Sequence, residues 1–252
     1  MVEKTFYALV YAWTGFGLLL FPLLLKIPAP YGRHSRPGWG VMVSGRLGWL
    51  LMELPALVVF AFFFLAGPLE QGAAASLFFG LWMLHYANRT LIFPFRLKSG
   101  EKRMPVVIVL MAFVFNCING FFNGYYFGFL APPYVLSWFL DSRFIIGVSL
   151  FFVGLAVNWR YDHILLGLKR LAGKQYLIPQ GGLFRYVSCP NHLGEVVEWG
   201  GFALMVWSLP ALSFFVWTVV NLLPRALDHH RWYKKQFEDY PPRRKALIPF
   251  LI

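Results

Sequence analysis

Charged side chains are scarce in this sequence, and cysteines are almost missing. Only 13% of the 252 residues are charged and 58% are hydrophobic, whereas soluble domains average about 25% charged and roughly 45–50% apolar residues. Both deviations indicate an integral membrane protein. The two cysteines, Cys117 and Cys189, offer neither a disulfide framework nor a metal-binding pattern. We therefore expect no metal site.

Two nucleotide-binding signatures are also missing: the glycine-rich dinucleotide fingerprint and the phosphate-binding loop. Any nucleotide must therefore be held by the helices and loops of the membrane domain itself. Acidic residues number 11 against 23 Lys and Arg, which gives a net charge of +12. These basic residues stand between apolar runs and not in a polar domain of their own, so we expect no nucleic-acid partner. No obligate protein partner is evident either.

Long apolar runs divide the chain into seven predicted membrane spans. About 20 apolar residues cross a bilayer as a helix. The predicted spans are residues 5–27, 47–66, 73–95, 105–130, 143–166, 194–209 and 210–227. The last two are separated only by a turn at Pro210, because proline suits the start of a helix and disrupts its interior. We predict an all-α fold in which residues 1–252 form a single membrane domain.

The distribution of basic residues predicts the orientation of these spans. With a turn at Pro210, 20 of the 23 Lys and Arg residues fall on one side of the membrane. Basic loops of membrane proteins face the cytosol. The pattern therefore places the N-terminus outside and the C-terminus in the cytosol. One long helix from Val196 to Leu227 would instead put the basic C-terminal residues outside.

Several polar residues lie at membrane depth, where they are costly and usually functional. Glu53 falls in the second span and Tyr86 in the third. A carboxyl group in an apolar site tends to stay neutral and can then donate a hydrogen bond. Glu53 beside the Tyr86 hydroxyl would thus polarise a buried carbonyl oxygen. The alternative for Glu53 is an ion pair with Arg46 or Arg89.

Asn116, Asn119 and Asn123 recur at helical spacing in the fourth span and form a polar stripe on one face. Amides in such a stripe either line a ligand pocket or hydrogen-bond to neighbouring helices as packing contacts. Both interpretations are open.

A second polar group lies at the cytosolic ends of the later spans. Lys169 and Arg170 supply the cationic donors that a phosphate-rich ligand needs. Amides, carboxylates and rings suited to an adenine or a ribose accompany them: Asn158, Asp162, Tyr176, Asn191, Glu195, Arg225, His229 and Tyr233. The last three are expected in the basic segment that begins at the cytosolic end of the final span. A lipid-facing basic rim does not explain the neighbouring carboxylates and amides.

Longer motifs run through the C-terminal half: Ile178-Pro-Gln-Gly-Gly-Leu-Phe184, Leu193-Gly-Glu195, Trp207-Ser-Leu-Pro-Ala211, Phe237-Glu-Asp-Tyr-Pro241 and Arg244-Lys-Ala-Leu-Ile-Pro-Phe250. These motifs resemble those of steroid 5α-reductases, with the vertebrate type 2 branch nearest. The resemblance reaches back through Glu53-Leu-Pro55 and His85-Tyr86, so it covers nearly the whole chain.

The resemblance implies an oxidoreductase that reduces the Δ4 double bond of 3-oxo steroids, such as testosterone or progesterone, with hydride from NADPH. It implies that Glu53 and Tyr86 bind the 3-oxo group and that the nucleotide-binding residues hold NADPH. The residues assigned to the substrate pocket are Tyr31, Trp199 and Asn119. Residues 1–130 would carry mainly substrate-pocket helices, and residues 131–252 mainly the NADPH-binding half. Departures from the family pattern at Met52, Phe93 and Met111 bear on the preferred steroid.

Two other functions fit parts of the pattern. An isoprenylcysteine-type methyltransferase also closes a helical bundle over a cytosolic cofactor, but S-adenosylmethionine has no phosphate to match the surplus of basic side chains. A membrane transporter would show inverted repeats, and none is apparent. In each case we expect a multi-pass membrane protein, in the endoplasmic reticulum of a eukaryote or the inner membrane of a bacterium. Glu198 receives no role beyond pairing with a basic neighbour.

Overall fold

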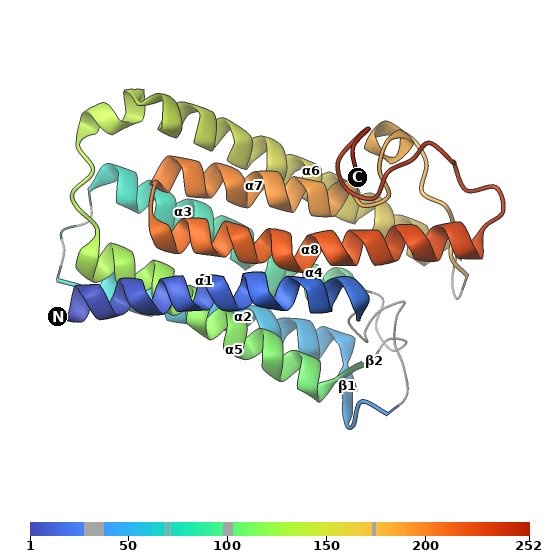
Figure 1. Cartoon of the computed structure of the whole chain (residues 1–252), viewed down its shortest axis with the longest axis horizontal. Coiled ribbons are helices and arrows are strands. Elements are labelled where there is room, and N and C mark those ends of the chain that lie inside the picture. The colour runs from blue at the N-terminus through green and yellow to red at the C-terminus, as the bar shows by residue number, and fades with distance from the viewer. Residues whose placement is uncertain (28–37, 69, 71, 98–102, 173–174) are drawn as a thin grey trace. The chain divides into compact units, whose positions relative to one another are not determined.

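The computed structural model describes residues 1–27, 38–68, 70, 72–97, 103–172 and 175–252 (Figure 1). The fold is almost entirely helical, as predicted. The long helices are α1 (Val2–Lys26), α2 (Gly45–Ala66), α3 (Ala73–Ala87), α5 (Val106–Tyr125), α6 (Ser142–Ala172), α7 (Pro190–Val206) and α8 (Leu209–Gln236). A π-helical turn at Asn88–Ile92 joins α3 to the short α4 (Phe93–Arg96). A two-stranded antiparallel sheet of β1 (Met42–Ser44) and β2 (Arg103–Pro105) was not predicted.

Short helical turns complete the described secondary structure. A π-helical turn at Tyr126–Leu130 follows α5, and 3₁₀ turns lie at Leu136–Leu140 and Gly182–Arg185. The start of α6 is fixed by Asp141, whose carboxylate accepts hydrogen bonds from the backbone and the guanidinium of Arg143. These hydrogen bonds lower the pKa of Asp141 to about 2.

Within the described part of the chain, five helices are long and apolar enough to cross a membrane: Val2–Lys26, Gly45–Ala66, Val106–Leu130, Ser142–Lys169 and Leu209–Gln236. Large apolar side chains along α1 are exposed, including Leu18, Leu19 and Leu23. Such a surface is stable only in an apolar solvent. The chain is therefore a multi-pass membrane protein.

The predicted turn before the last helix is confirmed. Helix α7 ends at Val206, and Trp207 adopts a left-handed conformation with φ of 53°. The Ser208 hydroxyl then accepts a hydrogen bond from the Ala211 amide at 3.3 Å, which caps the start of α8. Pro210 lies in the first turn of α8, where its missing N–H costs nothing.

Helix α8 extends beyond residue 227, where the last predicted span ends, and continues to Gln236. Residues 225–236 contain neither glycine nor proline, and the first breakers after them are Pro241 and Pro242. The apolar run indicates only the part of the helix that is suited to a bilayer. The helix itself can continue through polar residues until a helix-breaking residue follows. Arg225, His229 and Tyr233 are therefore held on a helix.

The chain folds as two compact units. Unit 1 comprises residues 1–10, 29–145 and 208–211, and unit 2 comprises residues 11–28, 146–207 and 212–252. In unit 1, α5 packs closely on α2. A Cβ added to Gly124 would lie 2.6 Å from the Phe60 carbonyl oxygen, so this approach requires glycine. Phe60 also stacks on Trp82 of α3, with ring centroids 4.5 Å apart.

In unit 2, α7 packs against both α6 and α8. Glycines bring α6 and α7 together, because a Cβ on Gly194 would lie only 2.5 Å from the Asn158 backbone nitrogen. Helix α8 packs on α7 through Trp199 and Phe214, whose ring centroids are 4.5 Å apart. These close contacts determine how the polar side chains of α6 and α7 meet.

Candidate active site

In unit 1, Glu53 of α2 faces Arg89 of the π-helical turn. The Glu53 Oε1 atom lies 3.8 Å from the Arg89 Nη2 atom, and the two side chains are 13% and 11% exposed. The Arg89 guanidinium also lies over the rings of Trp49 and Phe93, at 4.7 and 4.8 Å from their centroids. Arg89 is thus one of the two ion-pair partners foreseen for Glu53. A π-helical turn of this kind is frequent at functional sites.

Tyr86 and Asn119 also meet in unit 1, at the interface of α3 and α5. The Asn119 Nδ2 atom donates a hydrogen bond to the Tyr86 hydroxyl oxygen at 3.5 Å, and both side chains are buried. Trp82 and His85 flank the Tyr86 ring, each with a centroid distance of 5.0 Å. The predicted carbonyl-binding tyrosine is therefore fixed in orientation by a residue that we assigned to the same pocket.

The structure assigns different contacts to the three asparagines of the polar stripe. Asn116 donates to the Met52 carbonyl oxygen at 2.7 Å, and Asn123 donates to the Asn119 side-chain oxygen at 3.0 Å. Asn116 therefore ties α5 to α2, close to Pro55 in α2. Asn123 holds the Asn119 amide so that its nitrogen faces Tyr86. The packing interpretation is confirmed for Asn116, and the pocket role of Asn119 stays a prediction.

In unit 2, four of the predicted nucleotide-binding residues form one hydrogen-bonded network between α6 and α7. Asn158 Nδ2 donates to the Asn191 carbonyl oxygen at 3.1 Å and to the Glu195 carboxylate at 3.3 Å. Asn191 Nδ2 in turn donates to the Asp162 carboxylate at 2.9 Å. Alternating amides and carboxylates fix each other's orientation, which presents a rigid polar surface.

One acceptor of this network, the Asn158 side-chain oxygen, is buried and has no hydrogen-bond partner among the residues that the structure describes. Asn158 is 1% exposed. A buried amide oxygen without a donor costs free energy, and such atoms in folded proteins often mark a ligand that completes the bond. The adenine amino group and the ribose hydroxyls of a nucleotide supply such donors. The network therefore fits a nucleotide.

The three predicted residues of α8 are spaced four apart, so they lie along one helical face. The His229 ring packs against the ring of His192 from α7, with centroids 5.7 Å apart. Tyr233 is buried and stacks on Tyr240 with centroids 5.3 Å apart. Arg225 is partly buried on the same face.

The structure describes most of the remaining predicted residues, but not all of them. Tyr176 packs against Trp232 of α8 at 4.8 Å, and Lys169 is partly exposed near the end of α6. Trp199 and Glu198 are buried in unit 2. Tyr31 and the side chain of Arg170 lie outside the described residues, so their roles stay predictions.

Sequence reasoning missed a group of residues at the C-terminal end of unit 2. The Ser188 hydroxyl contacts His230 and Tyr240, each at 2.6 Å. Tyr240 stands in the motif from Phe237 to Pro241, and Lys245, whose carbonyl also contacts Ser188, stands in the motif from Arg244 to Phe250. Those motifs were the available signal, but no chemistry had been assigned to them.

Comparison with known proteins supplies the family. Residues 102–252 match the family model described as 3-oxo-5-alpha-steroid 4-dehydrogenase. A steroid 5-alpha-reductase of Gossypium hirsutum is 42% identical over 90% of both chains. A 3-oxo-5-alpha-steroid 4-dehydrogenase 1 of Bos taurus is 39% identical over 97% of this chain and 96% of the relative. A 3-oxo-5-alpha-steroid 4-dehydrogenase 2 of Sus scrofa is 43% identical over 89% of both chains.

The chain belongs to the steroid 5-alpha-reductase family. Membership makes it an oxidoreductase of steroid metabolism and favours the reductase over the methyltransferase and the transporter. The similar identities to plant, type 1 and type 2 reductases show that the family resemblance is broad.

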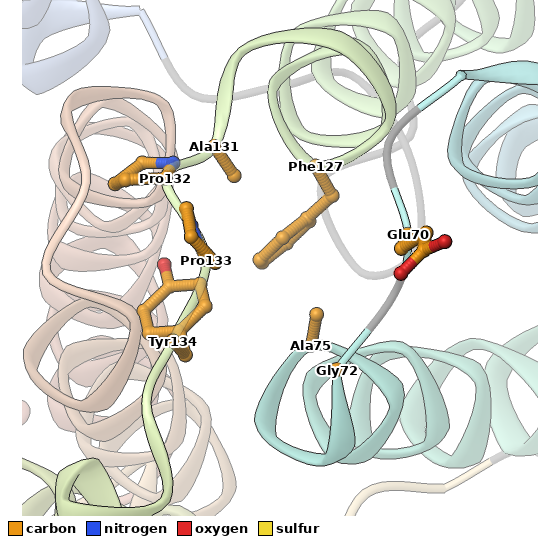
Figure 2. Close-up of a pocket in the computed structure, with 8 residues that line it drawn as sticks. All are labelled: Glu70, Gly72, Ala75, Phe127, Ala131, Pro132, Pro133 and Tyr134. Atoms are coloured by element: carbon orange, nitrogen blue, oxygen red, sulfur yellow. The ribbon is translucent and has the colours of Figure 1, made fainter.

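This reductase also has a pocket of about 220 Å³ in unit 1 (Figure 2). It opens at the N-terminal end of α3, and the ring of Phe127 extends into the space between Tyr134 and Ala75. Glu70 lies at its edge, across from Pro132 and Pro133. Its described lining includes none of the predicted site residues, so it is separate from the Tyr86–Asn119 contact.

Proposed function

We propose that this reductase converts Δ4-3-oxo steroids, such as testosterone or progesterone, into 5α-steroids, with hydride delivered from NADPH to C5. The family match and the names of the relatives support a steroid substrate. The observation that carries the proposal is the Tyr86–Asn119 hydrogen bond, buried at membrane depth in unit 1.

Reduction of an enone at its β-carbon develops negative charge on the carbonyl oxygen, and the enolate formed takes up a proton at its α-carbon, C4, to give the 5α-steroid. Tyr86 donates a hydrogen bond to that oxygen and stabilises the charge. Because Tyr86 accepts a hydrogen bond from Asn119, its own O–H is polarised and becomes a stronger donor. Removing one such donor typically costs about 2.7–4 kcal/mol in the transition state.

Glu53 is the second proposed donor to the 3-oxo group. A carboxyl group donates only when it is protonated, because a carboxylate only accepts. The contact to Arg89 at 3.8 Å is longer than a hydrogen bond, so it leaves the carboxyl group able to hydrogen-bond a steroid. The Trp49 and Phe93 rings hold the guanidinium in place.

The NADPH site is proposed in unit 2. Bound NADPH supplies the hydride. The network of α6 and α7 fits the adenine and ribose groups, because the buried Asn158 oxygen needs a donor and the Asp162 and Glu195 carboxylates are held by neighbouring amides. Arg225 offers a bidentate contact to a phosphate. The other proposed cofactor residues are Lys169, Arg170, Tyr176, Asn191, His229 and Tyr233.

Two further spans complete the proposed topology. The helical run from Ala73 to Arg96 and helix α7 join the five helices of membrane length. Seven spans put the N-terminus outside and the basic C-terminus in the cytosol. The membrane is the endoplasmic reticulum in a eukaryotic host and the inner membrane in a bacterial one.

Turnover of purified protein tests the proposal. The protein is incubated with NADPH and a panel of Δ4-3-oxo steroids, and products are identified by mass spectrometry against 5α and 5β standards. We expect 5α products, and Tyr86→Phe should lower kcat roughly a hundredfold or more with unchanged NADPH affinity. Tyr11→Phe, at an exposed tyrosine of α1, is the matched control. Near-normal turnover in Tyr86→Phe would remove Tyr86 from the active site.

A further inference from the structure

Three segments of unit 2 meet at the hydroxyl group of Ser188. The Ser188 Oγ atom lies 2.6 Å from the Tyr240 hydroxyl, 2.6 Å from His230 Nδ1 and 3.0 Å from the Lys245 carbonyl oxygen. Ser188 and Tyr240 are both buried, and His230 is half-buried. Ser188 precedes α7, His230 belongs to α8, and Tyr240 and Lys245 belong to the C-terminal segment, residues 237–252.

The number of protons that these groups carry sets the direction of each hydrogen bond. The Lys245 carbonyl can only accept, so Ser188 donates its single proton there. Tyr240 and His230 must then both donate to the two lone pairs of Ser188. Burial raises the pKa of Tyr240, which keeps its proton available for donation. A neutral His230 consequently carries its proton on Nδ1, and its Nε2 is an acceptor.

The backbone ties the same segments together. The Ser188 amide donates to the Lys245 carbonyl at 2.8 Å, and the Cys189 amide donates to the Ala246 carbonyl at 3.1 Å. The Lys245 amide donates to the Tyr186 carbonyl at 2.7 Å. The C-terminal segment is therefore fastened to the chain directly before α7 begins at Pro190.

Each member of the network adjoins a proposed cofactor residue. Ser188 stands three residues before Asn191 in the chain. His230 is the neighbour of His229 on α8. The Tyr240 ring stacks on Tyr233 with centroids 5.3 Å apart and planes 9° apart. One hydroxyl group therefore links the start of α7 to the α8 face that carries His229 and Tyr233.

We propose that Ser188, His230 and Tyr240 are positioning residues of the NADPH site, which they complete by clamping the C-terminal segment onto α7 and α8. This inference rests on the proposed function, because it takes Asn191, His229 and Tyr233 as cofactor contacts. The network acts through these residues and touches neither hydride nor steroid, so it sets NADPH affinity and leaves the chemical step unchanged.

Substitution of Tyr240 separates affinity from chemistry. Tyr240→Phe keeps the ring on Tyr233 and removes only the hydroxyl donor. NADPH affinity, followed by fluorescence titration, should fall about threefold to tenfold, the effect of one hydrogen bond, and kcat should stay unchanged. Tyr186→Phe is the matched control, because Tyr186 is an exposed tyrosine of the same region. Ser188→Ala should lower NADPH affinity to a similar extent. Because the two hydroxyl groups act as one unit, the double variant should bind NADPH about as well as either single variant.

The proton assignment has its own test. Selective ¹⁵N labelling of histidine, with His230→Gln to assign the signal, reports which ring nitrogen is protonated. We expect the Nδ1–H tautomer in the whole protein and loss of that preference in Ser188→Ala. A predominant Nε2–H tautomer would overturn the network as assigned.

If the protein binds NADPH but Tyr240→Phe and Ser188→Ala bind it like the control, only this inference fails. If the unaltered protein does not bind NADPH, the proposed cofactor fails as well.

Discussion

At the residue scale, asparagine performs two different tasks at membrane depth. Asn116 satisfies a backbone carbonyl of α2, whereas Asn119 is held by Asn123 so that its amide faces Tyr86. Helical spacing predicts that the three share a face, but it does not say which neighbour each side chain meets. That choice depends on the approach of α2 and α3, which only tertiary structure provides.

Glu53 gives a prediction at this scale. Glu53→Gln removes the acidic proton that the proposed donor role requires, so we expect kcat/KM for the steroid to fall at least tenfold, since one buried donor contributes on that order. NADPH affinity should be unchanged. Glu70→Gln, at an exposed carboxyl group of unit 1, serves as the control. Steady-state kinetics with varied steroid would contradict the role if both variants matched the unaltered protein.

The nucleotide-binding residues were predictable to different degrees. Asn158 and Asp162 stand four apart on one helix, and Asn191 and Glu195 repeat that spacing on the next. The spacing alone therefore places the two residues of each helix on one helical face. The structure joins all four by hydrogen bonds. The Ser188–Tyr240 contact joins residues 52 apart in sequence, and no periodicity predicts how a C-terminal segment folds back.

At the scale of elements, glycine sets the distance between α6 and α7. A Cβ on Gly194 would lie 2.5 Å from the Asn158 nitrogen and 2.7 Å from the Gly154 carbonyl oxygen, both backbone atoms. Since Asn158 and Glu195 hydrogen-bond at this crossing, helix spacing and the proposed cofactor site depend on the same residue. The sequence predicts both helices but not their separation.

Gly194→Ala should therefore push the two helices apart. We expect a loss of about 1–3 kcal/mol in the free energy of unfolding, the usual cost of overpacking, together with weaker NADPH binding. Gly167→Ala is the control, because a Cβ there meets nothing within 4 Å, and alanine favours a helix. Thermal denaturation in detergent compares the two. Equal stability of the two variants would contradict the close α6–α7 packing.

Helix α8 extends beyond residue 227, where the last predicted span ends. Hydropathy ends near residue 227, where polar side chains begin. The helix continues because its hydrogen bonds are internal and no breaker follows before the proline pair. This extension places Arg225, His229 and Tyr233 at regular spacing on one helical face.

At the scale of the whole molecule, charge asymmetry decides orientation. The basic residues gather in alternate connections of the predicted spans. Cysteine labelling tests this arrangement in intact cells or sealed vesicles, with Cys117 and Cys189 replaced and single cysteines introduced at Glu3 or Arg243. A membrane-impermeant reagent should label position 3 from outside and position 243 only after permeabilisation. Labelling of position 243 from outside would contradict the seven-span topology.

In the proposed reaction, hydride from NADPH reaches C5 of a Δ4-3-oxo steroid. The most direct measurement uses NADPH deuterated at the transferring position of the nicotinamide, with the product analysed by mass spectrometry and NMR. We expect one deuterium at C5, on the α face, and a C4 hydrogen without label. Deuterium at C3, or a reduced product without deuterium, would contradict it.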